Sequence, residues 1–304
     1  MKIETIMKLI LMCEILEEIM QVNTEQIYSK LNNIQNLPTI PEIMFDAISA
    51  IKTQPGNILK ISEIIGKDQG MATKILSVAN SPLYGMLRKV STLEFAIMIM
   101  GSSELEKIVT AISLTNAIRF KPIPNFNEQE YWKHTMAVGL IAKDISRRLG
   151  FPEIAGDAFI GGILHDIGIQ LIVKYFPQEF ELMFSNLRED KKFLECEINT
   201  LGISHQEIGA FLLKKWNLPN SITDCVLYHH HPHNSNENKE LVAIVHLADF
   251  ITNEFRSAKG YWDQGIQLDT HNCDALGFDS HNDLVNFYSE YSDLVSDTVD
   301  SIRI

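Results

Sequence analysis

The sequence predicts an all-α protein, and three observations support this prediction. Apolar residues recur three and four positions apart along successive segments, as they do on the buried face of a helix. Capping residues precede many of these segments, and glycine or proline follows several of them. No segment shows a convincing strand-like alternation of apolar and polar residues, and no internal repeat or low-complexity tract stands out.

Turn and capping signals divide the first half of the chain into helices. Pro41 opens one helix, Asn57 caps the next, and Asp68 caps a third. Residues 80–85, with the sequence Asn-Ser-Pro-Leu-Tyr-Gly, then form a strong turn. Two further helices are expected at capping boxes, in which a serine precedes a glutamate by three positions: Ser91 with Glu94, and Ser103 with Glu106.

The best domain boundary lies at Lys121–Asn125, because two prolines within three residues cannot continue a helix. We therefore expect three parts. Residues 1–30 form an N-terminal helix that serves packing or dimerisation, and residues 31–121 form an N-terminal helical lobe. This lobe packs against a helical bundle with a C-terminal helix, formed by residues 122–304.

The second half continues as capped helices. Asn127 with Glu130 caps a long helix that ends at Gly150, and Phe151-Pro152 opens the next helix, which runs into residues 161–168. Four more helices are expected: one from a capping box at Ser204 and Glu207, one from Asn220 or Ser221 to His229-His230-His231, one from about Lys239 to Phe255, and a terminal helix from about Asp283 to Ile302.

Composition limits the classes of function. Hydrophobic residues make up 45% of the 304 residues, which is enough for a substantial core. A formal net charge of −13 argues against a broad basic surface for nucleic acid, while a small phosphate ligand held by a local cation stays compatible with it. Four cysteines without a CxxC pair suit a reducing cytoplasm. The first twenty residues carry several glutamates, so we expect neither a signal peptide nor a membrane segment.

A dispersed set of histidines and aspartates is the most informative feature for function. The set comprises His134, His165, Asp166, His205, His229, His230 and Asp249. Iron, manganese, nickel and zinc accept imidazole and carboxylate ligands, so the set predicts a site for one or two divalent transition-metal ions. His165 and Asp166 can share that site if their helix ends there, and Gly168 is the residue expected to permit the end.

The residues alone leave other interpretations open. A single inward histidine is more often a hydrogen-bonded core residue than a ligand, and His205 in a first helical turn can lie near the surface. The histidines at 229–231 can form a solvated helix end. His246 and Asp249 lie three positions apart and can pair with each other.

At these residues the chain resembles the HD superfamily of metal-dependent phosphohydrolases, and more closely its HDOD branch. The His165-Asp166 pair, within Gly161-Gly162-Ile163-Leu164-His165-Asp166-Ile167-Gly168, matches the superfamily signature. The HDOD branch is matched by several motifs in order: residues 37–42, 77–85, 90–97, 132–135, 205–210, 216–219 and 228–230. The resemblance covers roughly residues 30 to 250.

The resemblance implies an HD-like helical bundle and a regulatory role in bacterial signalling, through a signalling protein, a nucleotide-like ligand or a homodimer. The related HD-GYP phosphodiesterases place metal ligands at positions matching the seven residues above. The alternative it implies is a metal-dependent phosphohydrolase or cyclic-nucleotide phosphodiesterase, with Asp166 as the bridging catalytic residue. Two departures argue against catalysis: Ile169 stands where active relatives have lysine, and His231 where they have an acid. The Gly-Tyr-Pro signature is also absent after Pro232.

The turn in the first half offers a second candidate site. Asn80, Tyr84 and Arg88 cluster around it and are candidates for contact with a ligand or partner. The alternative is that Asn80 sets the turn geometry and Tyr84 packs against the core.

Overall fold

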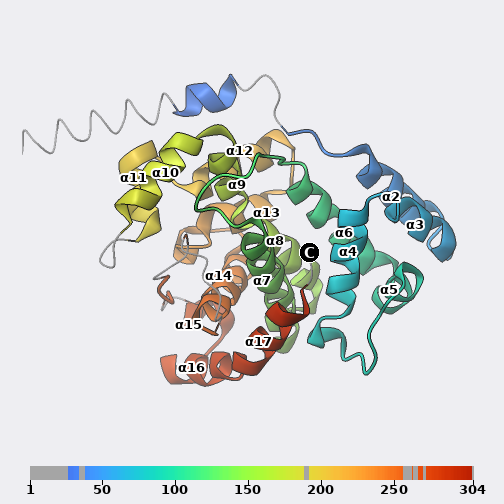
Figure 1. Ribbon diagram of the computed structural model, residues 1–304. Coiled ribbons are helices and arrows are strands. Elements are labelled where there is room, and N and C mark those ends of the chain that lie inside the picture. The colour runs from blue at the N-terminus through green and yellow to red at the C-terminus, as the bar shows by residue number, and fades with distance from the viewer. Residues whose placement is uncertain are drawn as a thin grey trace, which may run out of the picture.

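The computed structural model describes residues 27–33, 38–187, 192–255, 262, 266–269 and 272–302, and all regular structure in these ranges is helical (Figure 1). The prediction of an all-α protein is confirmed. Most of the expected N-terminal helix lies outside the described residues, which begin with a helical stretch at 27–32.

The N-terminal lobe contains five described helices and one 3-10 turn: α2 (Glu42–Thr53), α3 (Ile58–Ile65), α4 (Gln69–Ala79), η1 (Pro82–Tyr84), α5 (Leu93–Met100) and α6 (Ser102–Asn116). The bundle is built from α7 (Glu128–Arg148), η2 (Pro152–Ile154), α8 (Ala155–Leu164), α9 (Ile167–Tyr175), α10 (Pro177–Asn186), α11 (Phe193–Leu201), α12 (His205–Lys215), α13 (Asn220–Tyr228), η3 (Pro232–Asn234) and α14 (Lys239–Phe255). The chain closes with α15 (Asn272–Leu276), α16 (His281–Ser289) and α17 (Ser292–Ser301).

Helix α7 is the centre of the bundle. It packs along α8 and α14, while α6 of the N-terminal lobe packs against α8 (Figure 1). The lobe therefore sits on the bundle as expected, although the boundary between the two at residue 121 stays a prediction. The crossing of α7 and α8 is close, because a Cβ on Gly162 would lie 2.7 Å from the Cα of Gly139.

Several predicted caps are confirmed by hydrogen bonds. The side chains of Asn57, Asp68 and Asn127 accept from backbone N–H groups in the first turns of α3, α4 and α7. Ser204 and Glu207 form the expected capping box at the start of α12. This box fixes the chain entry into α12 and so places His205 at the first helical position.

The other two predicted capping boxes are wrong. Thr92, not Ser91, caps α5, and Glu94 instead accepts a hydrogen bond from the Ser62 hydroxyl at 2.8 Å. Helix α6 begins at Ser102, directly after Gly101, whose φ of 72° makes a sharp entry without a side-chain cap. At α5, a neighbouring residue that caps equally well shifts the start of the helix by one position, and sequence spacing does not detect this shift.

The predicted terminal helix is two helices, α16 and α17, joined at Glu290 and Tyr291. Tyr291 is fully buried and donates a hydrogen bond to the Asp144 carboxylate on α7 at 2.8 Å. This contact ties the C-terminal pair of helices to the centre of the bundle.

Helix α8 ends at Leu164, and His165 and Asp166 form the turn before α9. The expected helix break is therefore present, but Gly168 does not cause it, because Gly168 lies inside α9. A Cβ on Gly168 would lie 1.9 Å from the backbone oxygen of His205. The glycine instead lets α9 approach the start of α12, which brings His205 to the turn.

The stretch Pro152–Tyr175 is long and apolar enough to cross a membrane by length and composition. It consists of η2, α8 and α9, and 83% of its most apolar window is buried inside the protein. Burial of this kind identifies it as the core of the bundle.

The lobe and the bundle also meet through polar contacts. The Tyr84 hydroxyl and the Lys143 ammonium both bond Glu104. The Nζ atom of Lys74 lies 3.6 Å from the centre of the Trp132 ring, in a cation–π contact between α4 and α7. Burial lowers the pKa of Lys74 to about 8, although the carboxylates of Glu128 and Asp68 oppose this shift.

Gly168→Ala is expected to destabilise the fold by about 3 kcal/mol or more, because the new methyl group overlaps the backbone of α12. Urea unfolding followed by circular dichroism measures this change. Gly56→Ala is the matched control, since no heavy atom lies within 4 Å of its added Cβ. Equal stability of the two variants would contradict the close contact between α9 and α12.

The lowered pKa of Lys74 predicts a pH-dependent stability. The folded state holds the Lys74 proton less tightly than the unfolded chain, whose lysine pKa is about 10.4. The free energy of unfolding is therefore expected to rise by on the order of 1 kcal/mol between pH 8 and pH 10. Urea unfolding at both pH values tests this, with Lys74→Met as the variant that loses the rise; identical pH profiles would refute it.

Candidate metal centre

The structure brings the seven predicted donor residues together in the interior of the bundle. They come from five places: His134 on α7, His165 and Asp166 in the turn before α9, His205 at the start of α12, His229 and His230 after α13, and Asp249 on α14. Six of them are fully buried, and His230 is partly buried. Their assignment as metal ligands stays a prediction.

The first group of donors surrounds one point between α7, α14 and the turn. The Nε2 atoms of His134 and His165 lie 3.3 Å apart. The Oδ2 atom of Asp166 is 3.2 Å from His165 Nε2, and the Oδ1 atom of Asp249 is 3.2 Å from His134 Nε2. Two imidazoles and two carboxylates therefore converge, and three of them can hold a single ion together.

The second group lies on the other side of Asp166. The Nε2 atoms of His205 and His229 lie 3.2 Å apart, and His230 places a ring nitrogen within 4.8 Å of both of these histidines. The Oδ1 atom of Asp166 is 3.4 Å from His205 Nε2 and 3.7 Å from His229 Nε2. Asp166 thus directs one carboxylate oxygen toward each group, as a bridging ligand does.

Spacings of this size fit donors around a common ion. Metal–nitrogen bonds are about 2.0–2.1 Å long, so neighbouring donors of a tetrahedral or octahedral ion lie roughly 3.0–3.4 Å apart. The shortest donor pairs here lie 3.2–3.3 Å apart. In addition, Asp166 Oδ1 and Asp249 Oδ2 are buried without a hydrogen-bond partner within the described ranges. The residues therefore fit a metal.

Hydrogen bonds to the opposite ring nitrogens orient three of the histidines. His165 Nδ1 is 2.7 Å from the Gly162 carbonyl, and His229 Nδ1 is 2.8 Å from the Val226 carbonyl. A carbonyl only accepts, so each Nδ1 carries the proton and leaves the Nε2 lone pair for the interior. Each ring is therefore held in the tautomer that binds a cation.

Glu197 on α11 performs the same task for His205, and the sequence prediction missed it. Its Oε2 atom accepts from His205 Nδ1 at 2.8 Å and from the His205 backbone N–H at 2.9 Å. Glu197 is fully buried. A lone glutamate on an amphipathic helix carries no local signal for this role, because the contact forms only when α11 and α12 pack.

His246 also has a role that the sequence did not predict. Its Nδ1 donates to the His229 backbone carbonyl at 2.6 Å, and its Nε2 accepts from the Asp269 N–H at 3.0 Å. The alternative that His246 hydrogen-bonds Asp249 does not hold, because both ring nitrogens of His246 bond other groups. Trp262 donates its indole N–H to Asp166 Oδ2 at 2.9 Å and closes the first group from outside.

The electrostatics of the centre favour neutral imidazoles at His229 and His230 and ionised carboxylates at Asp166 and Asp249. Burial lowers the pKa of His229 well below its usual range, and burial with the neighbouring His205 lowers the pKa of His230 to about 3. Burial alone would raise the pKa of Asp166, but His165, His205 and His229 hold it well below its usual value. These are the protonation states that a metal requires of its ligands.

Ile169 and His231, the two residues at which the resemblance argues against catalysis, differ in burial. Ile169 is fully buried in α9 and belongs to the hydrophobic core, so it offers no polar group to the centre. His231 is exposed, and its backbone N–H donates to the Tyr228 carbonyl at 2.9 Å. Neither residue joins the two groups of donors.

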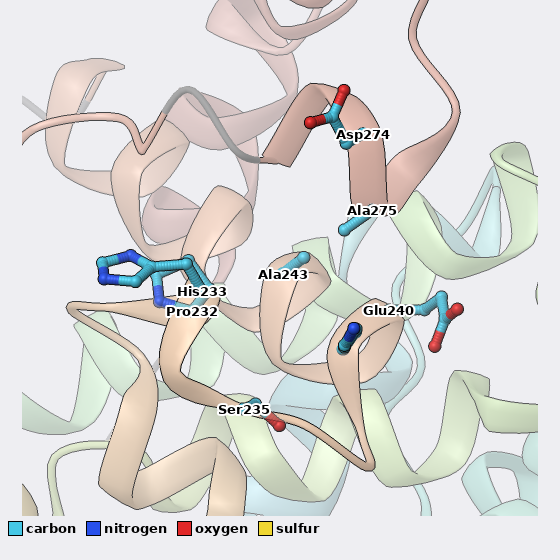
Figure 2. A pocket seen from close by; sticks show the side chains of 8 residues that line it. Pro232, His233, Ser235, Glu240, Ala243, Asp274 and Ala275 are labelled. Carbon is cyan, nitrogen blue, oxygen red and sulfur yellow. The ribbon is translucent and has the colours of Figure 1, made fainter.

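A surface pocket of about 360 Å³ lies between η3, the start of α14 and α15, and none of the seven donor residues lines it (Figure 2). Figure 2 shows Ala243 and Ala275 facing one another across it, with Asp274 above them. His233, one of its lining residues, has its Nδ1 atom 2.6 Å from Asp269 Oδ2, and the Asp269 N–H donates to His246 Nε2. A chain of hydrogen bonds thus links the surface to the backbone of His229.

The second candidate site is held by structural contacts. The side chain of Asn80 bonds the Leu76 carbonyl and both backbone groups of Val90, and so fixes the loop after η1. Tyr84 bonds Glu104 at the contact with the bundle, and Arg88 is exposed. Their role in ligand contact stays a prediction.

Comparison with known proteins gives a family match and a shared fold. The model of the HDOD domain matches residues 37–232. A protein of Treponema pallidum whose function is uncharacterised is 23% identical over 235 residues, which are 76% of this chain and 45% of that protein. The chain therefore spans less than half the length of this relative.

Two solved structures share the fold. An HDOD domain protein of unknown function from Geobacter sulfurreducens has a TM-score of 0.72 and 24% identity, covering 94% of this chain and 99% of the other. A proposed phosphohydrolase from Shewanella amazonensis has a TM-score of 0.66 and 20% identity, covering 90% and 98%. At these identities the likeness shows the fold alone.

Glu197→Gln is expected to weaken metal binding by about 10- to 100-fold, because partners that orient a ligating histidine typically contribute this much. Competition with a chromophoric chelator measures the affinity. Glu195→Gln, an exposed position on the same helix, is the control and should bind metal as the native chain does. If both variants bound equally, Glu197 would have no part in holding His205 for a metal.

Proposed function

Because the chain belongs to the HDOD family, we propose that it is a regulatory module of bacterial signal transduction that holds a buried transition-metal centre. In this proposal the module acts by binding a signalling protein or a nucleotide-like ligand in the cytoplasm, without robust catalysis. The observation that carries the proposal is the convergence of oriented Nε2 atoms on Asp166 in a closed interior.

Burial supports a metal over a simple polar core. Asp166 and Asp249 are fully buried, and no lysine or arginine in the described residues forms an ion pair with either. The neutral imidazoles of His229 and His230 do not balance these charges. A divalent cation does, and iron, manganese, nickel or zinc suits this mixture of nitrogen and oxygen donors.

The closed surroundings of the centre support binding over catalysis. A phosphoester substrate needs direct access to the ions, whereas six of the seven donor residues are fully buried. The indole N–H of Trp262 also donates a hydrogen bond to the Asp166 oxygen that faces the first group. Ile169 supplies no charge for a substrate phosphate at the position where active relatives have lysine.

A metal-dependent phosphohydrolase is the second candidate, and the position of Asp166 is the observation that favours it. Two ions on either side of a shared carboxylate can activate water and bind a phosphoryl group. In that case His134, His165 and Asp249 hold one ion, His205, His229 and His230 hold the other, and Asp166 bridges them.

Metal analysis of protein purified without chelator tests the proposal. We expect one or two transition-metal ions per chain in the native protein, and loss of most of this metal in the His165→Ala, Asp166→Ala variant. His281→Ala, at an exposed histidine on α16, is the control and should keep its metal. Native protein free of metal even after reconstitution would overturn the metal centre.

Turnover of phosphoester substrates separates the two candidate functions. With iron or manganese loaded, the regulatory module is expected to show no enzyme-like rate on simple phosphoesters or cyclic nucleotides. Turnover at rates of about 1 per second or more, lost in the His165→Ala, Asp166→Ala variant, would establish the hydrolase instead.

A further inference from the structure

A second cavity, of about 350 Å³, lies at the seam between the N-terminal lobe and the bundle. Its walls come from α4, the end of α6, α7 and α9, and none of the seven donor residues lines it. Small-molecule sites in proteins have volumes of about 300–1,000 Å³, so the cavity suits a compact ligand. Six of its lining residues define the chemistry of that ligand: Asp68, Lys74, Arg119, Glu128, Trp132 and Gln170.

Two cations in this cavity can bind an anionic group. Lys74 is largely buried, with its ammonium over the Trp132 ring and bonded to the side-chain oxygen of Asn116. An ammonium has three N–H donors, so it can also bond an incoming anion. Arg119 is exposed at the rim of the same cavity and adds a planar, permanently charged donor.

Two uncharged groups in the cavity wall need hydrogen-bond partners. Trp132 and Gln170 are 3% and 4% exposed. The indole N–H of Trp132 and the Oε1 atom of Gln170 have no hydrogen-bond partner within the described residues. A buried donor and a buried acceptor of this kind destabilise the folded protein while they stay unpaired. A ligand with an acceptor and a donor on one planar edge can satisfy both.

Two carboxylates complete the lining. Glu128, at the first position of α7, is exposed, and Asp68 caps α4 through one oxygen. Carboxylates accept hydrogen bonds from hydroxyl groups but repel a ligand that is anionic throughout. The lining therefore favours a ligand with one anionic end, hydroxyl groups and a polar heterocycle.

We propose that this cavity binds a nucleoside monophosphate. The phosphate lies between Lys74 and Arg119, the base presents its polar edge to Trp132 and Gln170, and the ribose hydroxyls lie near Glu128 and Asp68. Inorganic phosphate satisfies only the first of these contacts, and a free nucleoside only the last two.

Such a ligand would contact both halves of the protein. It would also lie at the start of a series of contacts that leads through Tyr131 and Trp262 to the metal centre. Lys74 and Arg119 belong to the N-terminal lobe, while Trp132 and Gln170 belong to the bundle. Tyr131, which also lines the cavity, packs with its ring 5.8 Å from that of Trp262, which bonds Asp166. The binding of the nucleotide is inferred from the cavity alone. Only its regulatory effect rests on the proposed function.

Calorimetric titration of the full chain with AMP, GMP, CMP and UMP tests the proposal, with inorganic phosphate and adenosine as partial ligands. We expect at least one mononucleotide to bind about tenfold or more tightly than either partial ligand. Lys74→Met and Arg119→Met are each expected to weaken that binding by about tenfold, because each removes hydrogen bonds to a charged group. Gln170→Leu should weaken the nucleotide and leave phosphate binding unchanged.

Lys60→Met is the matched control, since Lys60 lies on α3, outside the cavity, and should bind the nucleotide normally. Arg119 is exposed, so its variant tests the site even if substitution of Lys74 impairs folding. The proposal is overturned if no mononucleotide binds at millimolar concentration, or if the Lys74 and Arg119 variants bind as the native chain does. The metal analysis is independent of this titration, because the two sites share no residue.

Discussion

Burying the carboxylates of Asp166 and Asp249 in an apolar bundle carries a large desolvation cost, and the surrounding structure is arranged to offset it. The histidines bring polar nitrogens to within 3.2–3.7 Å of these oxygens, but most of their protons face outward, onto backbone carbonyls or Glu197. The inner surface of the cluster is therefore rich in lone pairs and poor in protons. A cation is the one simple species that satisfies all of these donors together.

The close helix contacts of the bundle follow from this requirement. The turn that carries His165 and Asp166 reaches His205 only because α9 and α12 approach at Gly168, where a methyl group would meet the backbone. On the α12 side, Gly209 allows the same approach, since its Cβ would lie 3.1 Å from the backbone nitrogen of Gly168 on α9. Small residues therefore determine the position of the donors as much as the donors themselves do.

The sequence could predict the helical architecture and the donor set, because caps, apolar periodicity and the His-Asp context are local signals. The box at Ser204 and Glu207 fixed the place of His205, whereas the pattern at Ser91 and Glu94 failed because Thr92 competes for the same end. Glu197, Trp262 and the cavity at Lys74 were not predicted. Each depends on contacts between segments that are distant in sequence, and a single glutamate, tryptophan or lysine does not indicate which residue it contacts.

The donor residues come from five separate segments of the bundle, and this distribution gives the metal a mechanical role. Two ions, one on each side of Asp166, would together cross-link α7, the turn before α9, α12, the end of α13 and α14, as a disulfide cross-links two segments of a chain. Binding free energy at such a site becomes folding free energy, because the unfolded chain cannot assemble it. Metal supply would then set how much folded protein a cell contains, even if the ion never meets a substrate.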